Sequence, residues 1–166
     1  MFSFMYEDPD EISTILPDRL YIGSAEAAKH KAALERLKVK FIISIGDPDD
    51  VYVIHEGFEY HRINMLDKTH QGILTHAALD QIVDLMVDHP GGILVHCYAG
   101  RSRSAAVVIA YMIRVHKMRY VDAHGFVKAR RRYIKPNSEF VKVLAGWVPG
   151  WVPAQPAPSP SGSTAE

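Results

Sequence analysis

The segment from Val95 to Ser104, V-H-C-Y-A-G-R-S-R-S, combines residue types that could bind and attack a phosphate group. Cys97 is the only cysteine of the chain, and Arg103 follows it six positions later. A cysteine thiolate is a strong nucleophile, and a planar guanidinium can hold two phosphoryl oxygens at once. We therefore predict that Cys97 is a catalytic nucleophile and that Arg103 grips the phosphate.

The position of this segment supports the same chemistry. It follows a short apolar stretch, residues 93–95, and precedes an apolar helix predicted over residues 104–116. The free N–H groups at a helix N-terminus attract anions, and a glycine lets the preceding loop curl so that its amides point inward. Such a loop also favours the thiolate form of a cysteine. The backbone amides that we predict to bind substrate belong to Tyr98, Ala99, Gly100, Arg101 and Ser102.

The pattern H-C-x-x-G-x-x-R-S resembles the phosphate-binding loop, C-x5-R, of the protein tyrosine phosphatase superfamily. Over roughly residues 17–147 the chain is similar to the small, atypical dual-specificity phosphatases, including Leu20–Ser24 and Arg131–Asn137. This resemblance implies hydrolysis of phosphotyrosine, phosphoserine and phosphothreonine in proteins through a phosphocysteine intermediate. It implies no cofactor and no metal ion.

A phosphate ester also needs a general acid, because the departing oxygen is a poor leaving group. Asp67 lies 30 residues before Cys97, and one predicted helix and one strand between them return it to the same edge of a sheet. The resemblance places the general acid on an aspartate at about this distance, so we assign the role to Asp67. The other carboxylates near strand ends, Asp47, Asp49 and Asp50, are interpreted as turn residues, and His70 is the alternative acid.

Three further residues take supporting roles from the resemblance. The Ser104 hydroxyl is expected to help the thiolate leave in the second step, although a serine at a helix start can also be only a cap. His96 is expected to position the Cys97 backbone and tune its thiolate, and Asn137 to brace the phosphate-binding loop. The basic run 130–132 is interpreted as a solvated helix face, with a second phosphate-binding patch as the alternative.

The pattern of apolar residues predicts strands alternating with helices, hence an α/β fold with a central, mostly parallel sheet flanked by helices. The phosphate-binding loop should lie between a central strand and a helix. Strands are expected at residues 20–22, 39–45, 58–63 and 93–95, and helices at 24–37, 73–89, 104–116, 120–133 and 138–147. Residues 1–12 form an acidic extension, 13–148 the catalytic domain, and 149–166 a disordered tail rich in proline and serine.

Composition limits the partners and the location. Lysine plus arginine equals aspartate plus glutamate at 19 each, so no general attraction to nucleic acid or anionic membrane is expected. The nine histidines form no metal-binding spacing, and one cysteine cannot form a zinc knuckle. A lone cysteine in a chain with no visible secretory signal fits a reducing compartment, so we predict a cytoplasmic protein, with the nucleus as a second location. The oligomeric state does not follow from these data.

Two alternatives to a protein phosphatase stay open. One is a phosphatase acting on a phosphoinositide, a phosphorylated glycan or an RNA 5′-phosphate; the absence of lysine from residues 98–102 disfavours the lipid. The other is a phosphate-binding module without activity, which the joint presence of Cys97, Arg103 and Asp67 disfavours.

Overall fold

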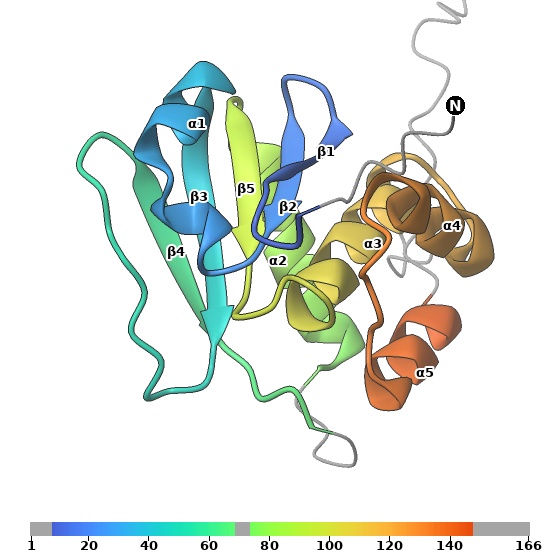
Figure 1. Ribbon diagram of the computed structural model, residues 1–166. Coiled ribbons are helices and arrows are strands. Elements are labelled where there is room, and N and C mark those ends of the chain that lie inside the picture. The colour runs from blue at the N-terminus through green and yellow to red at the C-terminus, as the bar shows by residue number, and fades with distance from the viewer. Residues whose placement is uncertain (1–7, 69–73, 148–166) are drawn as a thin grey trace, which may run out of the picture.

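A computed structural model describes residues 8–68 and 74–147 of the chain. A five-stranded sheet in the order β1-β2-β5-β3-β4 forms its centre, as Figure 1 shows. The strands are β1 (Ser13–Leu16), β2 (Leu20–Gly23), β3 (Val39–Gly46), β4 (Glu59–Asn64) and β5 (Gly92–His96). The helices are a 3-10 turn η1 (Ala27–Lys29), α1 (Lys31–Arg36), α2 (His76–Asp88), α3 (Arg103–Val115), α4 (Tyr120–Arg130) and α5 (Ser138–Gly146).

The sheet is mostly parallel, as predicted. Strands β2 and β3 both run parallel to the central strand β5, and β4 runs parallel to β3. Every residue of β5 is buried, because layers of helices cover both faces of a parallel sheet. The register places Ser44 of β3 opposite His96, the last residue of β5. The strand therefore delivers the following residue, Cys97, to the carboxyl edge of the sheet, where ligands bind in open α/β folds.

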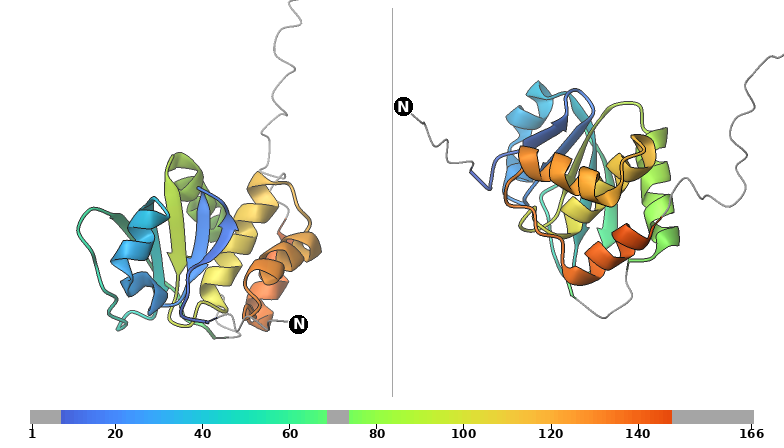
Figure 2. Two further views of the ribbon diagram at one scale, coloured as in Figure 1. Left: turned by 45° about the horizontal axis from the view of Figure 1, so that its top comes forward. Right: turned by 90° about the vertical axis from the view of Figure 1, so that its right-hand side faces the viewer.

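The helices form two layers of unequal size. Helix α1 and η1 cover one face of the sheet, and α2 and α3 lie against the other, with α4 and α5 packed outside α3 (Figure 2). Because α3 lies between the sheet and this outer layer, residues 103–113 are all buried. The nearly all-round apolar character of this helix is explained by its central place in the larger core.

Two predicted elements differ from those observed. The helix predicted over residues 24–37 is divided into η1 and α1, because His30 between them has a non-helical backbone with φ −83° and ψ 79°. Ser24 still caps this region, since its Oγ accepts the N–H of Ala27 at 3.1 Å. Strand β1 was not predicted, and it joins the sheet antiparallel to β2.

The helix boundaries also shift. Helix α2 begins at His76 instead of residue 73, because the Thr75 side chain caps it by accepting the N–H of Ala78. Helix α4 ends at Arg130, three residues before the predicted end at 133. The predicted disordered tail, residues 149–166, lies outside the described residues, and so does His70.

Candidate active site

The loop between β5 and α3 brings two polar groups against the sulfur of Cys97. The backbone N–H of Gly100 donates to Cys97 Sγ at 3.2 Å, and Ser104 Oγ lies 3.1 Å from the same sulfur. Helix α3 begins at Arg103, so Ser104 is its second residue and its hydroxyl points back to the thiol. Ser102, not Ser104, is the N-cap residue. These contacts stabilise a sulfur that carries negative charge.

The tight curl of this loop requires glycine at position 100. Gly100 has φ +66°, a left-handed conformation that other residues rarely adopt. A Cβ atom here would lie 2.6 Å from both the Gly23 carbonyl oxygen and Arg131 Nη2. The loop is thus closed in from the outside, and its amide at position 100 faces inward to the sulfur.

Arg131 contacts the outer side of the loop through its side chain. The interpretation of residues 130–132 as a solvated helix face is therefore wrong for Arg131. Its side chain is buried, and its Nε donates to the Gly100 carbonyl at 2.8 Å. Its other nitrogens donate to the carbonyls of Pro9 at 2.7 Å and Glu11 at 3.1 Å and to Ser13 Oγ at 3.0 Å. One guanidinium therefore joins the phosphate-binding loop to the segment that leads into β1.

A spacing in the sequence could have identified Arg131. The buried residues of α4 are Ala123 and Val127, and Arg131 follows at the next interval of four. Residues four apart share one face of a helix, so position 131 continues this face in the helix predicted over residues 120–133. In the structure Arg131 lies one residue past the end of α4, with an extended backbone.

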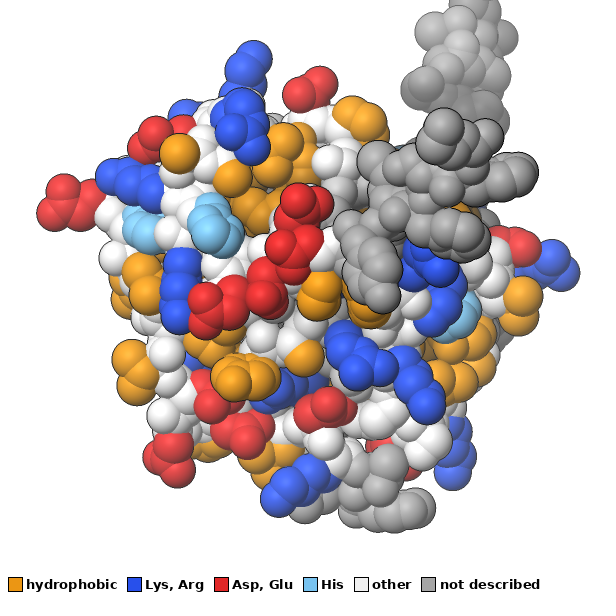
Figure 3. Space-filling view, viewed as in Figure 1, with side chains coloured by type: hydrophobic (Ala, Val, Ile, Leu, Met, Phe, Trp, Pro, Cys, Tyr) orange, Lys and Arg blue, Asp and Glu red, His pale blue; other side chains and the backbone are white. Residues whose placement is uncertain are grey.

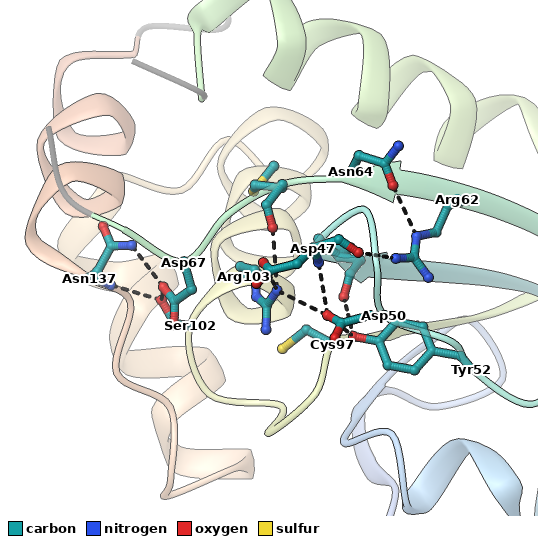
Figure 4. A network of polar contacts seen from close by, with 12 residues as sticks. Asp47, Asp50, Tyr52, Arg62, Asn64, Asp67, Cys97, Ser102, Arg103 and Asn137 are labelled. Carbon is teal, nitrogen blue, oxygen red and sulfur yellow. Dashed lines mark hydrogen bonds and ion pairs between the residues drawn. The ribbon is translucent and has the colours of Figure 1, made fainter. Parts of the chain in front are cut away.

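Arg103 is buried at the start of α3 and points into the site, as Figure 4 shows. Its Nη1 donates to Asp47 Oδ1 at 3.1 Å and to the Met65 carbonyl at 3.3 Å, and Asp50 Oδ2 lies 3.9 Å away. Its Nε atom is buried and has no hydrogen-bond partner within the described residues. A buried donor without a partner is uncommon and often marks a place where a ligand binds. Asp47 and Asp50 are turn residues as predicted, and they also contact this guanidinium.

Asp67 is held by two residues from distant parts of the chain. Ser102 Oγ donates to Asp67 Oδ1 at 2.6 Å, and Asn137 Nδ2 donates to the same oxygen at 2.8 Å. The backbone N–H of Asn137 in turn donates to Ser102 Oγ at 3.0 Å. Asn137 also caps α5, because its Oδ1 accepts the N–H of Phe140. The side chain of Ser102, for which only a backbone role was predicted, thus links Asp67 to Asn137.

His96 lies buried behind the loop. Its Nε2 is 2.7 Å from Ser44 Oγ, and its Nδ1 is 3.3 Å from the Cys97 carbonyl oxygen. Burial lowers the pKa of His96 from 6.5 to about 4, against the opposing effect of the Cys97 carbonyl. The imidazole is therefore neutral at pH 7. The ring of Tyr52 packs edge-on against it, and burial, with Asp50 nearby, raises the pKa of Tyr52 to about 12.

A pocket of about 300 Å³ opens at this edge of the sheet and collects most of the predicted site residues. It is lined by Asp67, Cys97, Ala99, Arg101, Ser102, Arg103 and Lys135. The Tyr98 side chain is 68% exposed and is not among these lining residues. Arg101 lies at the surface, where its Nε donates to the Tyr133 carbonyl at 3.1 Å. The lining sets a thiol, a carboxyl group and a guanidinium around one hollow, which suits a tetrahedral anion.

Comparison with known proteins places the chain in a family. Residues 20–148 match the family model "Dual specificity phosphatase, catalytic domain". The chain belongs to the dual-specificity phosphatase family. This assignment confirms the resemblance seen in the sequence.

Individual relatives agree. A probable rhodanese domain-containing dual-specificity phosphatase of Dictyostelium discoideum is 37% identical over 80% of this chain and 28% of its own length. The phosphatase MPK-4 of Drosophila melanogaster is 34% identical over 81% of this chain and 35% of its own. This chain thus spans about a third of these two relatives. Dual-specificity phosphatase 21 of Homo sapiens is 32% identical, with coverage of 77% and 67%.

The fold agrees with solved structures. Human DUSP28 superimposes with a TM-score of 0.75 and 27% identity over 87% of this chain and 95% of its own. DUSP15 gives a TM-score of 0.75 and 29% identity, with coverage of 86% and 89%. The predicted fold is therefore confirmed, with the phosphate-binding loop between β5 and α3.

Across residues 8–68 and 74–147, no three histidine, cysteine, aspartate or glutamate side chains are grouped so that they could hold a metal ion. No helix in the same ranges has the length and apolar character needed to cross a membrane.

Proposed function

We propose that this chain hydrolyses phosphotyrosine and phosphoserine or phosphothreonine in proteins through a phosphocysteine intermediate on Cys97. The observation that carries the proposal is the convergence of Gly100 N–H, Ser104 Oγ and the buried Arg103 on the pocket that contains Cys97 Sγ. Membership of the dual-specificity phosphatase family supports the same reaction.

In the first step the Cys97 thiolate attacks phosphorus, the S–P bond forms, and the P–O bond to the substrate side chain breaks. Asp67, which lines the same pocket, gives its proton to the departing oxygen. Arg103 exchanges its contacts with Asp47 and the Met65 carbonyl for phosphoryl oxygens, and its unpartnered Nε gains an acceptor. These donors stabilise the charge of the transition state.

In the second step a water molecule attacks the phosphocysteine. Asp67 accepts its proton, the S–P bond breaks, and inorganic phosphate leaves. The thiolate re-forms 3.1 Å from the Ser104 hydroxyl and within hydrogen-bond distance of Gly100 N–H, so both groups stabilise it as a leaving group. His96, neutral and held by Ser44, keeps the Cys97 backbone in place without acting as a base.

The test compares wild type with Cys97→Ser on three substrates: an aryl phosphate, peptides carrying phosphotyrosine or phosphoserine, and a water-soluble phosphoinositide headgroup. We expect turnover of the aryl phosphate and of both peptides, and less than about 1% of that rate in Cys97→Ser. Faster turnover of the headgroup than of either peptide would favour a non-protein substrate. Phosphate binding without turnover in wild type would indicate a module without activity.

Location and partners follow as part of the same proposal. The lone thiol fits a reducing compartment, which supports a cytoplasmic or nuclear phosphatase. The partners are then phosphorylated proteins from those compartments.

A further inference from the structure

A second pocket lies beside the catalytic one, on the face of the sheet that α1 covers. Its volume is about 270 Å³, and its wall includes Asp50, Val51, Tyr52, Ile54, Tyr60 and Arg62. These residues come from β4 and from the loop that joins β3 to β4. This volume lies just below the range of about 300–1,000 Å³ that is typical of small-molecule pockets.

The second pocket shares its wall with the active site. Asp50 lines it and also lies 3.9 Å from Arg103 Nη1. Tyr52 lines it and packs edge-on against His96, the residue before Cys97, with ring centroids 4.8 Å apart. Figure 4 shows Asp50 and Tyr52 next to Arg103 and Cys97. Since each residue of an extended chain adds about 3.3 Å, a neighbour of a residue bound at Cys97 can reach this pocket.

The loop beside the pocket exposes apolar side chains to an unusual degree. Val51 is 94% exposed and Ile54 75%, and Val53 between them is also exposed. Among the described residues, these three make up half of the six large apolar side chains that are exposed. Clustered exposed apolar residues, unlike scattered ones, mark a surface that binds a partner.

The charges around the pocket restrict its occupant. Asp47, Asp49, Asp50 and Glu56 lie on the same loop, and Figure 3 shows acidic side chains grouped with apolar ones on the lower part of this face. An anionic membrane surface would be repelled here. Arg62 is already engaged, because its Nη2 donates to the Asp47 carbonyl at 2.6 Å and its guanidinium lies 4.9 Å from the Tyr52 ring centre. Protein groups therefore already hold the guanidinium of Arg62, and among the described residues the other basic side chain of this wall is His61.

We propose that this pocket is a specificity subsite that takes an apolar side chain next to the phosphorylated residue of a polypeptide substrate. The proposal rests on the proposed protein phosphatase activity. Tyr52 and Tyr60 supply the wall, and Val51 and Ile54 close over the bound side chain. A polypeptide with an apolar residue at this position buries that side chain in the pocket and so binds more tightly. An isolated phosphorylated residue has no such side chain to bury.

The experiment measures kcat/KM for phosphotyrosine peptides with alanine at every flanking position and for a series with one leucine at each position from −3 to +3. We expect leucine at one of these positions to raise kcat/KM about tenfold over the all-alanine peptide. In Val51→Asp and Ile54→Asp the ratio of kcat/KM for the leucine peptide to kcat/KM for the all-alanine peptide should fall toward one. Because the result is a ratio within each variant, a general change in activity cancels. Both side chains are exposed, so their replacement spares the core.

Val121→Asp is the matched control, since Val121 is 72% exposed and lies on α4. It should keep the wild-type ratio. A ratio near one at all positions in wild type, or an unchanged ratio in both loop variants, would overturn the subsite while leaving the phosphatase proposal intact. Failure to hydrolyse any peptide would instead remove the proposed function and the subsite with it. Wild type could instead dimerise or bind anionic vesicles, and Val51→Asp could abolish that binding. This result would assign the loop to another partner and also overturn the subsite.

Discussion

The guanidinium of Arg103 contacts the carboxylate of Asp47 at 3.1 Å, although 56 residues separate them. Asp47 lies in the turn after β3, at the same edge of the sheet as the phosphate-binding loop. In the proposed reaction this carboxylate competes with the substrate phosphate for the same nitrogen. The pair therefore sets how readily Arg103 becomes available.

Asp47→Asn should bind phosphate more tightly. The change removes one negative charge beside the anion site and weakens the grip on Arg103. The Asp47 side chain is about half exposed, so the gain is limited to about twofold to fivefold. Isothermal titration with inorganic phosphate measures it. Asp49→Asn, in the same turn but exposed, is the control; unchanged or weaker binding in Asp47→Asn would show that Asp47 orients Arg103 and does not compete.

Asp67→Asn should lower kcat in proportion to the basicity of the leaving group. An alkyl or phenyl phosphate needs a proton at the departing oxygen, and its kcat should fall 10²-fold or more, about 2.7 kcal/mol of transition-state stabilisation. An ester whose leaving group is a weak base should lose much less. A series of aryl phosphates gives the slope. Equal losses across the series would transfer the acid role away from Asp67.

Arg131→Lys should destabilise the protein severely. Lysine keeps the charge but cannot reach all the acceptors that the buried guanidinium contacts, among them the oxygens of Gly100, Pro9, Glu11 and Ser13. Buried hydrogen bonds to a charged group are worth about 1.5–3 kcal/mol each, so we expect a loss of about 3 kcal/mol or more in the free energy of unfolding. Urea denaturation measures it, with the exposed neighbour in Arg130→Lys as control. A loss under about 1 kcal/mol would contradict the structural role.

His96 should make the folded state less stable in acid. Its folded pKa, about 4, lies below the ordinary value of 6.5, so only the unfolded chain gains this proton between those pH values. Above pH 6.5 the imidazole is neutral in both states and adds no pH dependence. The free energy of unfolding falls as the pH drops from 6.5 to 4. At about 1.4 kcal/mol per pH unit, the loss reaches about 3 kcal/mol.

The measurement for His96 is the difference in unfolding free energy between wild type and His96→Asn at pH 7 and pH 4. This difference should shrink by about 3 kcal/mol, because the variant lacks the titrating group. The exposed His116, changed to asparagine, should leave the pH dependence as it is. A difference that stays constant from pH 7 to pH 4 would contradict the burial of a neutral imidazole at this position.

The local part of the site could be predicted from the sequence, and the distant part could not. Cys97, Gly100, Arg103 and Ser104 lie within eight residues, so a strand-to-helix turn suffices to bring them together. The contacts of Arg103 with Asp47 and of Arg131 with Gly100 depend on how separate elements pack. Strand β1 was missed for a similar reason, since four residues show too little alternation and the strand exists by pairing with β2.

The phosphocysteine intermediate is the central claim, and trapping it is the most direct test. Ser104→Ala should slow the second step more than the first, because it removes the hydroxyl 3.1 Å from the departing sulfur. With an aryl phosphate under rapid acid quench, this variant should show a burst of aryl product and carry one phosphoryl group per chain, which peptide mapping by mass spectrometry places on Cys97. Steady turnover with no phosphoryl group on Cys97, or a phosphoryl group on another residue, would contradict the account.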